Sequence, residues 1–140
     1  MLWIVRLDAE GRVLVRDEIP REDNRSFICA PTYVPTVADA TRVADHDLIV
    51  FRTIRDGRGG PEDWLVYRCS TGERVREAHV PEPPYRGSGH ACAYYAVQVP
   101  GAPDLCVLWD IFWYSGKESG HDMRLAVIDL EGREVWGVNL

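Results

Sequence analysis

Two histidines stand at matched places in the second half of the chain, and each closes a glycine-containing segment just ahead of an expected strand. These are His90 and His121. With Cys92 and Asp122 close by in the sequence, they offer the nitrogen, sulfur and oxygen ligands that zinc takes, or an imidazole and a carboxylate for acid–base chemistry. Period-two alternation along a strand would also place His90 and Cys92 on one face without any ligand. The sequence therefore assigns no metal or cofactor and keeps these residues as candidates.

A second set of residues suits the capture of a partner. Arginine, tyrosine and tryptophan dominate the binding energy of protein interfaces, and arginine also recognises acidic groups. The members of this set are Arg55, Arg58, Tyr85, Arg86, Trp113, Tyr114 and Lys117. Neighbouring carboxylates nearly cancel their charge, which disfavours nucleic acid and leaves a protein or peptide as the expected partner.

Three hairpins are expected to position these groups. Each has an apolar, β-rich run, a polar turn that closes on glycine, and a second β-rich run. The turn glycines are Gly11, Gly72 and Gly132, which are 61 and 60 residues apart. Longer hairpin loops need a positive φ that glycine supplies, so we expect it at all three positions. A gapless alignment on these glycines puts Trp3 and Trp64 at one repeat position, where both are expected to pack in the core or between sheets.

Further β-rich runs, such as 47–51 and 104–108, precede the two later hairpins. The sequence therefore predicts a single all-β domain over residues 1–140. It would consist of a hairpin at 2–18 followed by two four-strand antiparallel meanders at 26–80 and 90–139. No stretch carries the residue spacing of a convincing helix.

These four-strand units resemble the blades of a β-propeller. The run from Leu125 to Trp136, LAVIDLEGREVW, is similar to the last hairpin of such a blade. The resemblance is to the architecture alone, because the chain has neither the Gly-His and Trp-Asp pairs of WD repeats nor the paired glycines of Kelch repeats. Propellers usually have about four to eight blades, and this chain holds two and a half.

Because the chain has fewer blades than a propeller, two arrangements of its sheets are expected. One is a sandwich or open barrel, and the other is a partial propeller that further copies complete. A homo-oligomer through the edge of the N-terminal hairpin would finish the repeat series. That hairpin carries charged residues, among them Arg12, Arg16 and Glu18. Such charges are equally typical of a strand edge that faces water instead of another copy.

The connections of a meander alternate between its two ends. Short glycine turns at 8–11, 69–72 and 129–132 close one end. Long, polar connections at 19–26, 55–62, 81–90 and 112–122 fall at the other. Binding groups concentrate on loops carried by a rigid scaffold, so the long-loop end is the expected binding surface.

Composition narrows the classes of function. The chain has 140 residues, and 16 Lys and Arg against 22 Asp and Glu give a net charge of −6, which disfavours non-specific binding to nucleic acid or anionic lipid. No apolar run is long enough to span a membrane and the first residues lack a basic leader, so a cytoplasmic protein is expected. The cysteines form no Cys-x-x-Cys pair and are expected to be reduced; they are Cys29, Cys69, Cys92 and Cys106.

The leading hypothesis is a non-enzymatic binding module that recognises a protein or peptide through the long-loop end. The alternative is a small enzyme, or a ligand or metal binder, that uses His90, His121 and Asp122 in a polar pocket at the same end. Distance discriminates between the two. The alternative needs the imidazoles within roughly 3–5 Å of each other or of a shared ligand, whereas histidines that point apart across a flat surface argue against it.

Overall fold

A computed structural model describes residues 2–19, 26–27, 40–54 and 62–140. Within these ranges the chain forms strands β1 to β11 in three antiparallel sheets, with a single 3₁₀ turn, η2 (Ala44–His46), as the helical element. The prediction of an all-β protein is confirmed.

Each of the three sheets comes from one continuous part of the chain. The hairpin sheet pairs β1 (Leu2–Leu7) with β2 (Val13–Ile19). The middle sheet contains β3 (Ser26–Phe27), β4 (Ala40–Val43), β5 (Leu48–Ile54), β6 (Glu62–Arg68) and β7 (Arg74–Val80). The C-terminal sheet contains β8 (Ser88–Gln98), β9 (Leu105–Ser115), β10 (Glu118–Ile128) and β11 (Glu134–Asn139).

The middle sheet is four strands wide although it has five strands. Its order is β3-β5-β6-β7, and β4 also pairs with β5. Because β6 occupies one edge of β5, β3 and β4 share the other edge, with β3 opposite residues 53–54 and β4 opposite residues 48–51. The first strand of the expected meander is therefore two short pieces. The C-terminal sheet is a regular meander of order β11-β10-β9-β8.

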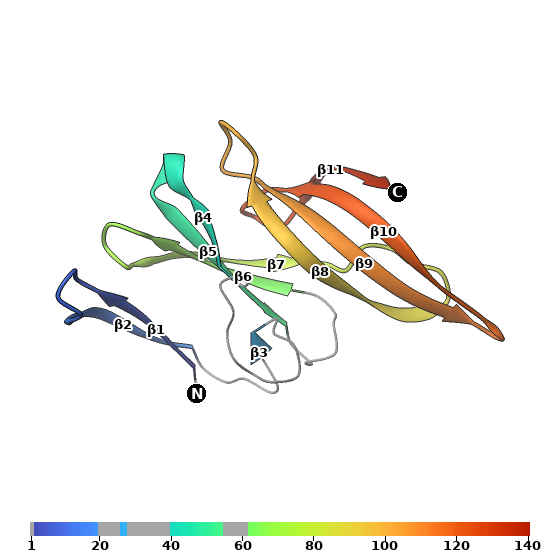
Figure 1. Cartoon of the computed structure of the whole chain (residues 1–140), viewed down its shortest axis with the longest axis horizontal. Coiled ribbons are helices and arrows are strands. Elements are labelled where there is room, and N and C mark those ends of the chain that lie inside the picture. The colour runs from blue at the N-terminus through green and yellow to red at the C-terminus, as the bar shows by residue number, and fades with distance from the viewer. Residues whose placement is uncertain (1, 20–25, 28–39, 55–61) are drawn as a thin grey trace.

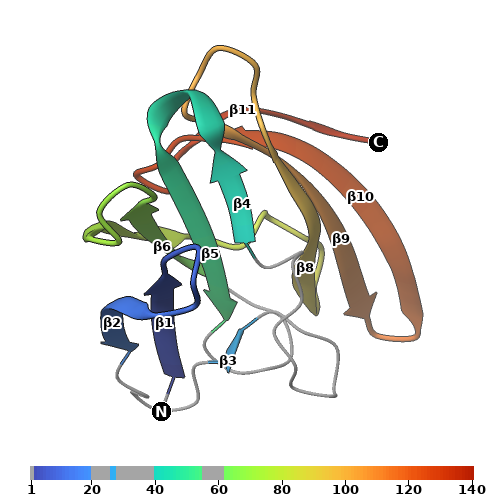
Figure 2. The same ribbon diagram turned by 60° about the vertical axis from the view of Figure 1, so that its left-hand side comes forward.

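The three sheets are stacked, with the middle sheet between the other two (Figure 1 and Figure 2). One face of the middle sheet and the inner face of the C-terminal sheet share the main core, to which Val50, Trp64, Val107, Trp109 and Ile128 belong. A smaller cluster on the opposite face of the middle sheet joins it to the hairpin through Ile4, packed against Leu65 and Tyr67. Alternating side chains on β5 and β6 thus serve both interfaces, as a strand buried on both faces requires.

The three glycine turns have the conformation that the sequence predicts. Gly11, Gly72 and Gly132 have φ of 82°, 74° and 83°. The register of each hairpin also shifts by a bulge just before the turn, at Arg6/Leu7, Val66/Tyr67 and Val127/Ile128. The similarity of the three hairpins therefore extends from their turns into their strand pairing.

The gapless alignment of the hairpins is wrong by one residue in the middle copy. Leu7 pairs with Val13 and Ile128 with Glu134, but Tyr67 pairs with Arg74, so the middle turn is one residue longer. Trp3 and Trp64 consequently face opposite ways. Trp64 is fully buried in the main core, whereas Trp3 is 37% exposed under the guanidinium of Arg16, 3.6 Å from its ring centroid.

The expectation of a long connection at 112–122 is also wrong. Strand β9 continues to Ser115 and β10 begins at Glu118, so a tight turn containing Gly116, with φ 63°, joins them. The strand pattern continues through this segment, with Ile111 and Trp113 on one face of β9 and Phe112 and Tyr114 on the other. The polar, glycine-containing residues that follow therefore form the tip of a hairpin. The connection between β7 and β8 spans residues 81–87, and most of the other two long connections lies outside the described residues.

Candidate binding surface

The segment between β7 and β8 supplies Tyr85 and Arg86. The phenol oxygen of Tyr85 lies 2.9 Å from a carboxylate oxygen of Glu82 and 3.2 Å from the carbonyl oxygen of Gly89, and its ring packs against the main core. The hydrogen bond to Glu82, assisted by partial burial, raises the pKa of Tyr85 above its ordinary value. Tyr85 therefore anchors this connection to the start of β8 and leaves Arg86 exposed beside it.

Arg86 lies near the indole of Trp113 on β9. The guanidinium carbon is 6.0 Å from the ring centroid, at the outer limit of a cation–π contact. The indole also covers Gly120 on the neighbouring strand, since a Cβ on Gly120 would come within 2.8 Å of ring atom Cζ2. Its Nε1 is shielded from solvent and has no hydrogen-bond partner among the described residues. The indole of Trp113 thus packs on Gly120 at the end of the sheet where Arg86 lies.

A groove of about 340 Å³ opens beside Tyr85 and Arg86. Its walls come from the β7–β8 connection, from β10 and from the end of β11, and the lining residues are Pro84, Tyr85, Arg86, Asp122, Asn139 and Leu140. A guanidinium, a carboxylate, an amide and apolar side-chain carbon therefore line the same groove. Hairpin pairing of β10 with β11, in which Arg124 lies opposite Asn139, brings the end of the chain to this place.

The predicted binding set is only partly assembled. Tyr85 and Arg86 line the groove and Trp113 supports it, but Tyr114 projects from the opposite face of β9, where its ring is 6.2 Å from that of Phe112. Lys117 is exposed in the β9–β10 turn, and Arg55 and Arg58 lie outside the described residues. The sequence reasoning did not assign Asn139 and Leu140 to binding. The hairpin register counted outward from Gly132 would have placed them beside Arg124 and Met123, in the middle of β10.

The two histidines do not converge. His90, Phe112 and His121 are direct neighbours across β8, β9 and β10. The phenyl ring therefore lies between the imidazoles, with centroid distances of 5.5 Å to His90 and 5.1 Å to His121. They sit two strand spacings apart on a flat sheet, roughly 10 Å, which is too far for a shared metal or a shared proton.

The remaining candidate ligands are similarly dispersed. His121 contacts Asp110 instead, Nδ1 to Oδ1 at 3.1 Å, while Asp122 faces the other side of β10 and lines the groove. Cys92 lies on β8, and its side chain is outside the described part of the structure. Across the described ranges, no three His, Cys, Asp or Glu side chains are grouped as a metal site requires. The structure therefore does not bring His90, His121 and Asp122 together in the shared pocket that the alternative requires.

No protein-family model, curated protein or solved structure matches this chain. The described part of the chain also contains no helix with the length and apolar character of a membrane span. The case for function therefore rests on the surface chemistry of the molecule itself.

Proposed function

We propose that this chain is a binding module that takes up an extended segment of a partner protein, or a peptide, in the groove between the β7–β8 connection and β10–β11. The observation that carries the proposal is the composition of that groove, which combines Arg86, Asp122 and Leu140. Its volume of about 340 Å³ lies at the low end of the range of roughly 300–1,000 Å³ for ligand pockets. A few side chains of a peptide fit such a space.

The groups in the groove favour a peptide with mixed character. The exposed guanidinium of Arg86 suits a carboxylate, which it can bind by two parallel hydrogen bonds. Asp122 accepts hydrogen bonds from a basic side chain or a backbone N–H, and Tyr85 with Leu140 offers apolar contact. Trp113 limits the positions open to Arg86, which lowers the entropy lost on binding.

Strand β11 offers a way to extend the contact beyond the groove. It is the terminal strand of its sheet and, in the described part of the chain, pairs with β10 alone. Extended peptides add to such edges through main-chain hydrogen bonds, while adjacent pockets select side chains. A peptide seated in the groove at Asn139 and Leu140 would continue naturally along this edge.

The proposal is tested with a random peptide library displayed on phage and selected against the immobilised protein. The dissociation constant of one selected synthetic peptide is then measured for the original chain and for Arg86→Ala, Asp122→Asn and Trp113→Leu. Loss of a central interface residue weakens binding by about 1–4 kcal/mol, or roughly five-fold to several-hundred-fold. We expect at least the lower end of that range for Arg86→Ala, with the association rate falling more at low salt than at high salt.

Arg42→Ala is the matched control, because Arg42 is an exposed arginine on β4 in the middle sheet. It should leave the affinity unchanged, as should Glu73→Gln at the opposite, turn end. Peptides that bind Arg86→Ala and Asp122→Asn as tightly as the original chain would refute the proposal. Melting curves for each variant separate a loss of binding from a loss of folding.

A further inference from the structure

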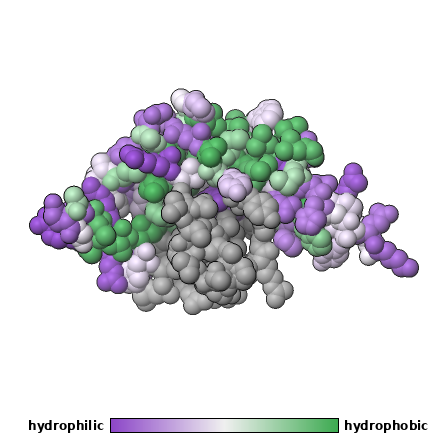
Figure 3. All heavy atoms as spheres, viewed as in Figure 1, coloured by the Kyte–Doolittle hydropathy of each residue, from purple (hydrophilic) through white to green (hydrophobic). Residues whose placement is uncertain are grey.

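The C-terminal sheet carries a second apolar face, and no strand of the described residues lies over it. This outer face is the side of the sheet turned away from the main core, and hydrophobic side chains gather where β9, β10 and β11 lie (Figure 3). Its most exposed apolar members are Tyr95, Val97, Trp136 and Val138, at 66%, 58%, 53% and 39% exposure. The cross-strand register places Cys106, Leu108, Leu125 and Val127 among them. Most sheets of this kind have one solvated face that is polar.

The hairpin sheet has an uncovered face at the other end of the stack. Ile4 faces the middle sheet, so Trp3, Val5 and Leu7 point away from it, and they are 37%, 43% and 52% exposed. Its turn is also open. A Cβ on Gly11 would meet nothing within 4 Å, whereas one on Gly72 or Gly132 would contact the preceding sheet.

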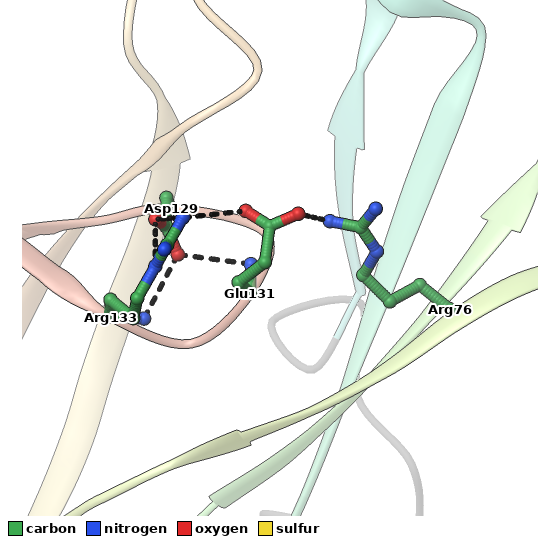
Figure 4. A network of polar contacts seen from close by, with 4 residues as sticks. All are labelled: Arg76, Asp129, Glu131 and Arg133. Atoms are coloured by element: carbon green, nitrogen blue, oxygen red, sulfur yellow. Dashed lines mark hydrogen bonds and ion pairs between the residues drawn. The ribbon is translucent and has the colours of Figure 1, made fainter.

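Inside the chain, the turn of each later sheet lies against the sheet before it, Gly72 against Arg6 and Val15 and Gly132 against His79 and Val80. Four residues after Gly11, Val15 lies 3.1 Å from the Cβ position of Gly72. Four residues after Gly72, Arg76 forms an ion pair with Glu131 in the following turn (Figure 4). The corresponding residue of the third sheet is Trp136, four residues after Gly132, and it has no following turn to contact within the described chain.

We propose that a second copy of this chain fills that position, with its hairpin face laid on the outer face of the C-terminal sheet. The turn at residues 8–12 of the second copy would then lie against Trp136, as the turn of the middle sheet lies against Val15. The contact continues the stacking that the chain already uses twice. It also covers both uncovered faces with one kind of interface, which a twofold pairing of outer faces would not do. The groove proposed for peptide binding is on the opposite side of the sheet and stays open.

The apolar part of the outer face would form only the centre of such a contact. Neighbouring strands are about 4.8 Å apart and side chains on one face repeat every 6.8 Å or so, which gives the apolar outer face roughly 300 Å² in the plane of the sheet. This is about the size of the largest apolar patch on an ordinary soluble protein, which is often functional. A stable contact buries about 800 Å² on each copy, so the polar residues around the apolar patch must also take part. A contact that uses one face of each copy is heterologous, so it builds closed rings or open chains of copies.

Analytical ultracentrifugation over a series of protein concentrations tests the proposal with two variants. Val5→Glu places a charge on the hairpin face, and Trp136→Glu places one on the outer face. We expect the original chain to associate as concentration rises and each variant to stay monomeric. Val75→Glu is the matched control, since Val75 is 41% exposed on β7 and belongs to neither face, and it should associate as the original chain does.

Mixing the two monomeric variants is the decisive step. Each retains one intact face, so an equimolar mixture should form a dimer through a single interface and go no further. Val138→Lys replaces Trp136→Glu if the latter lowers the melting temperature. A monomeric original chain at all concentrations would overturn the proposal. So would a Val5→Glu variant that still associates while Trp136→Glu does not, because that result indicates twofold pairing of outer faces.

Discussion

At the scale of single residues, an aspartate organises the first and last hairpin turns in the same way. Asp8 accepts hydrogen bonds from the backbone N–H of Glu10 and Arg12 and from the Arg12 side chain, and Asp129 does so from Glu131 and Arg133. In the middle turn, Asp47 from the η2 segment accepts hydrogen bonds from Ser70 instead. A carboxylate therefore accepts backbone hydrogen bonds in each of the three turns. In the middle turn this carboxylate belongs to a residue outside the hairpin.

The pKa of Asp8 should reflect this role. The hydrogen bond from the Arg12 backbone, followed by that from its side chain, holds the pKa below the ordinary 3.8. Because the folded value is lower than the unfolded one, the contribution to stability is present above pH 3.8 and is lost as pH falls through the folded value. A carboxyl NMR titration of Asp8 in the folded chain, compared with the urea-unfolded chain, measures the difference. Coincident titration curves would contradict it.

Substitutions at two of the turn glycines measure the cost of backbone strain and the cost of crowding separately. Gly11→Ala adds a Cβ in open space at positive φ, which costs about 1–2 kcal/mol. Gly132→Ala adds the same strain and also makes the Cβ overlap the carbonyl oxygen of His79. We expect the free energy of unfolding to fall by a further 1–3 kcal/mol or so in Gly132→Ala, measured by urea denaturation. An equal fall in the free energy of unfolding in both variants would show that the turn at Gly132 is not in close contact with β7.

A charged pair lies inside the main core. Arg52 Nη1 is 3.8 Å from Glu62 Oε1, both side chains are at most 1% exposed, and Trp64 Nε1 donates to Glu62 Oε2 at 2.8 Å. Arg52→Ala leaves a buried carboxylate without this partner and should lower the free energy of unfolding by about 3–5 kcal/mol. The double variant Arg52→Met with Glu62→Gln keeps the acceptor for Trp64 and should lose less, in the same urea assay. A double variant as unstable as Arg52→Ala would contradict this reading.

At the scale of elements, Tyr67 connects the hairpin to the middle sheet. Its hydroxyl donates to Asp17 on β2 at 2.6 Å, and Arg74 contacts the same carboxylate at 3.4 Å. Burial first, and then the hydrogen bond to Asp17, raises the pKa of Tyr67 above its ordinary 10. The neutral phenol is thus the form that holds the two elements together.

Tyr67→Phe should lower the free energy of unfolding by about 1.5–3 kcal/mol, the usual worth of one hydrogen bond to a charged group. Since the folded pKa is raised, the contribution of Tyr67 is complete below pH 10 and is lost as pH rises from there toward the folded value. Urea denaturation of both chains across the alkaline range measures this effect. The two stability curves should converge as the pH rises, and curves that stay parallel would rule out this linkage.

At the scale of the whole molecule, the two interfaces between sheets differ in extent. The middle and C-terminal sheets share the main core, whereas the hairpin is held by the small cluster around Leu65 and Tyr67. An isolated two-stranded hairpin is marginal in water, so local opening should begin there. At concentrations where the chain is monomeric, amide exchange should be faster in β1 and β2 than in β6 and β9. Equal protection of all four strands would mean that the molecule unfolds as one unit.

The sequence by itself determined the local structure of this protein. Apolar, β-rich runs beside polar turns predicted the strands, and glycine at the turns predicted positive φ at Gly11, Gly72 and Gly132, because both properties depend on a few neighbouring residues. The all-β fold and its division into a hairpin and two meanders followed. The errors arose where local appearance is ambiguous: a polar hairpin tip at 112–122 resembles a loop, and one extra residue in the middle turn is invisible to a gapless alignment.

Only the tertiary structure decided which residues meet. It placed Phe112 between His90 and His121, brought Asp122 and Leu140 to Arg86, and left Trp3 and Trp136 at opposite ends of the stack. These outcomes depend on strand order, on the register across strands and on which face of each sheet another layer covers. A one-residue shift in pairing moves a side chain to the other face of a sheet. For that reason the residue types of a candidate site can be recognised in a β-sheet sequence, while their convergence is fixed only by pairing and stacking over long distances along the chain.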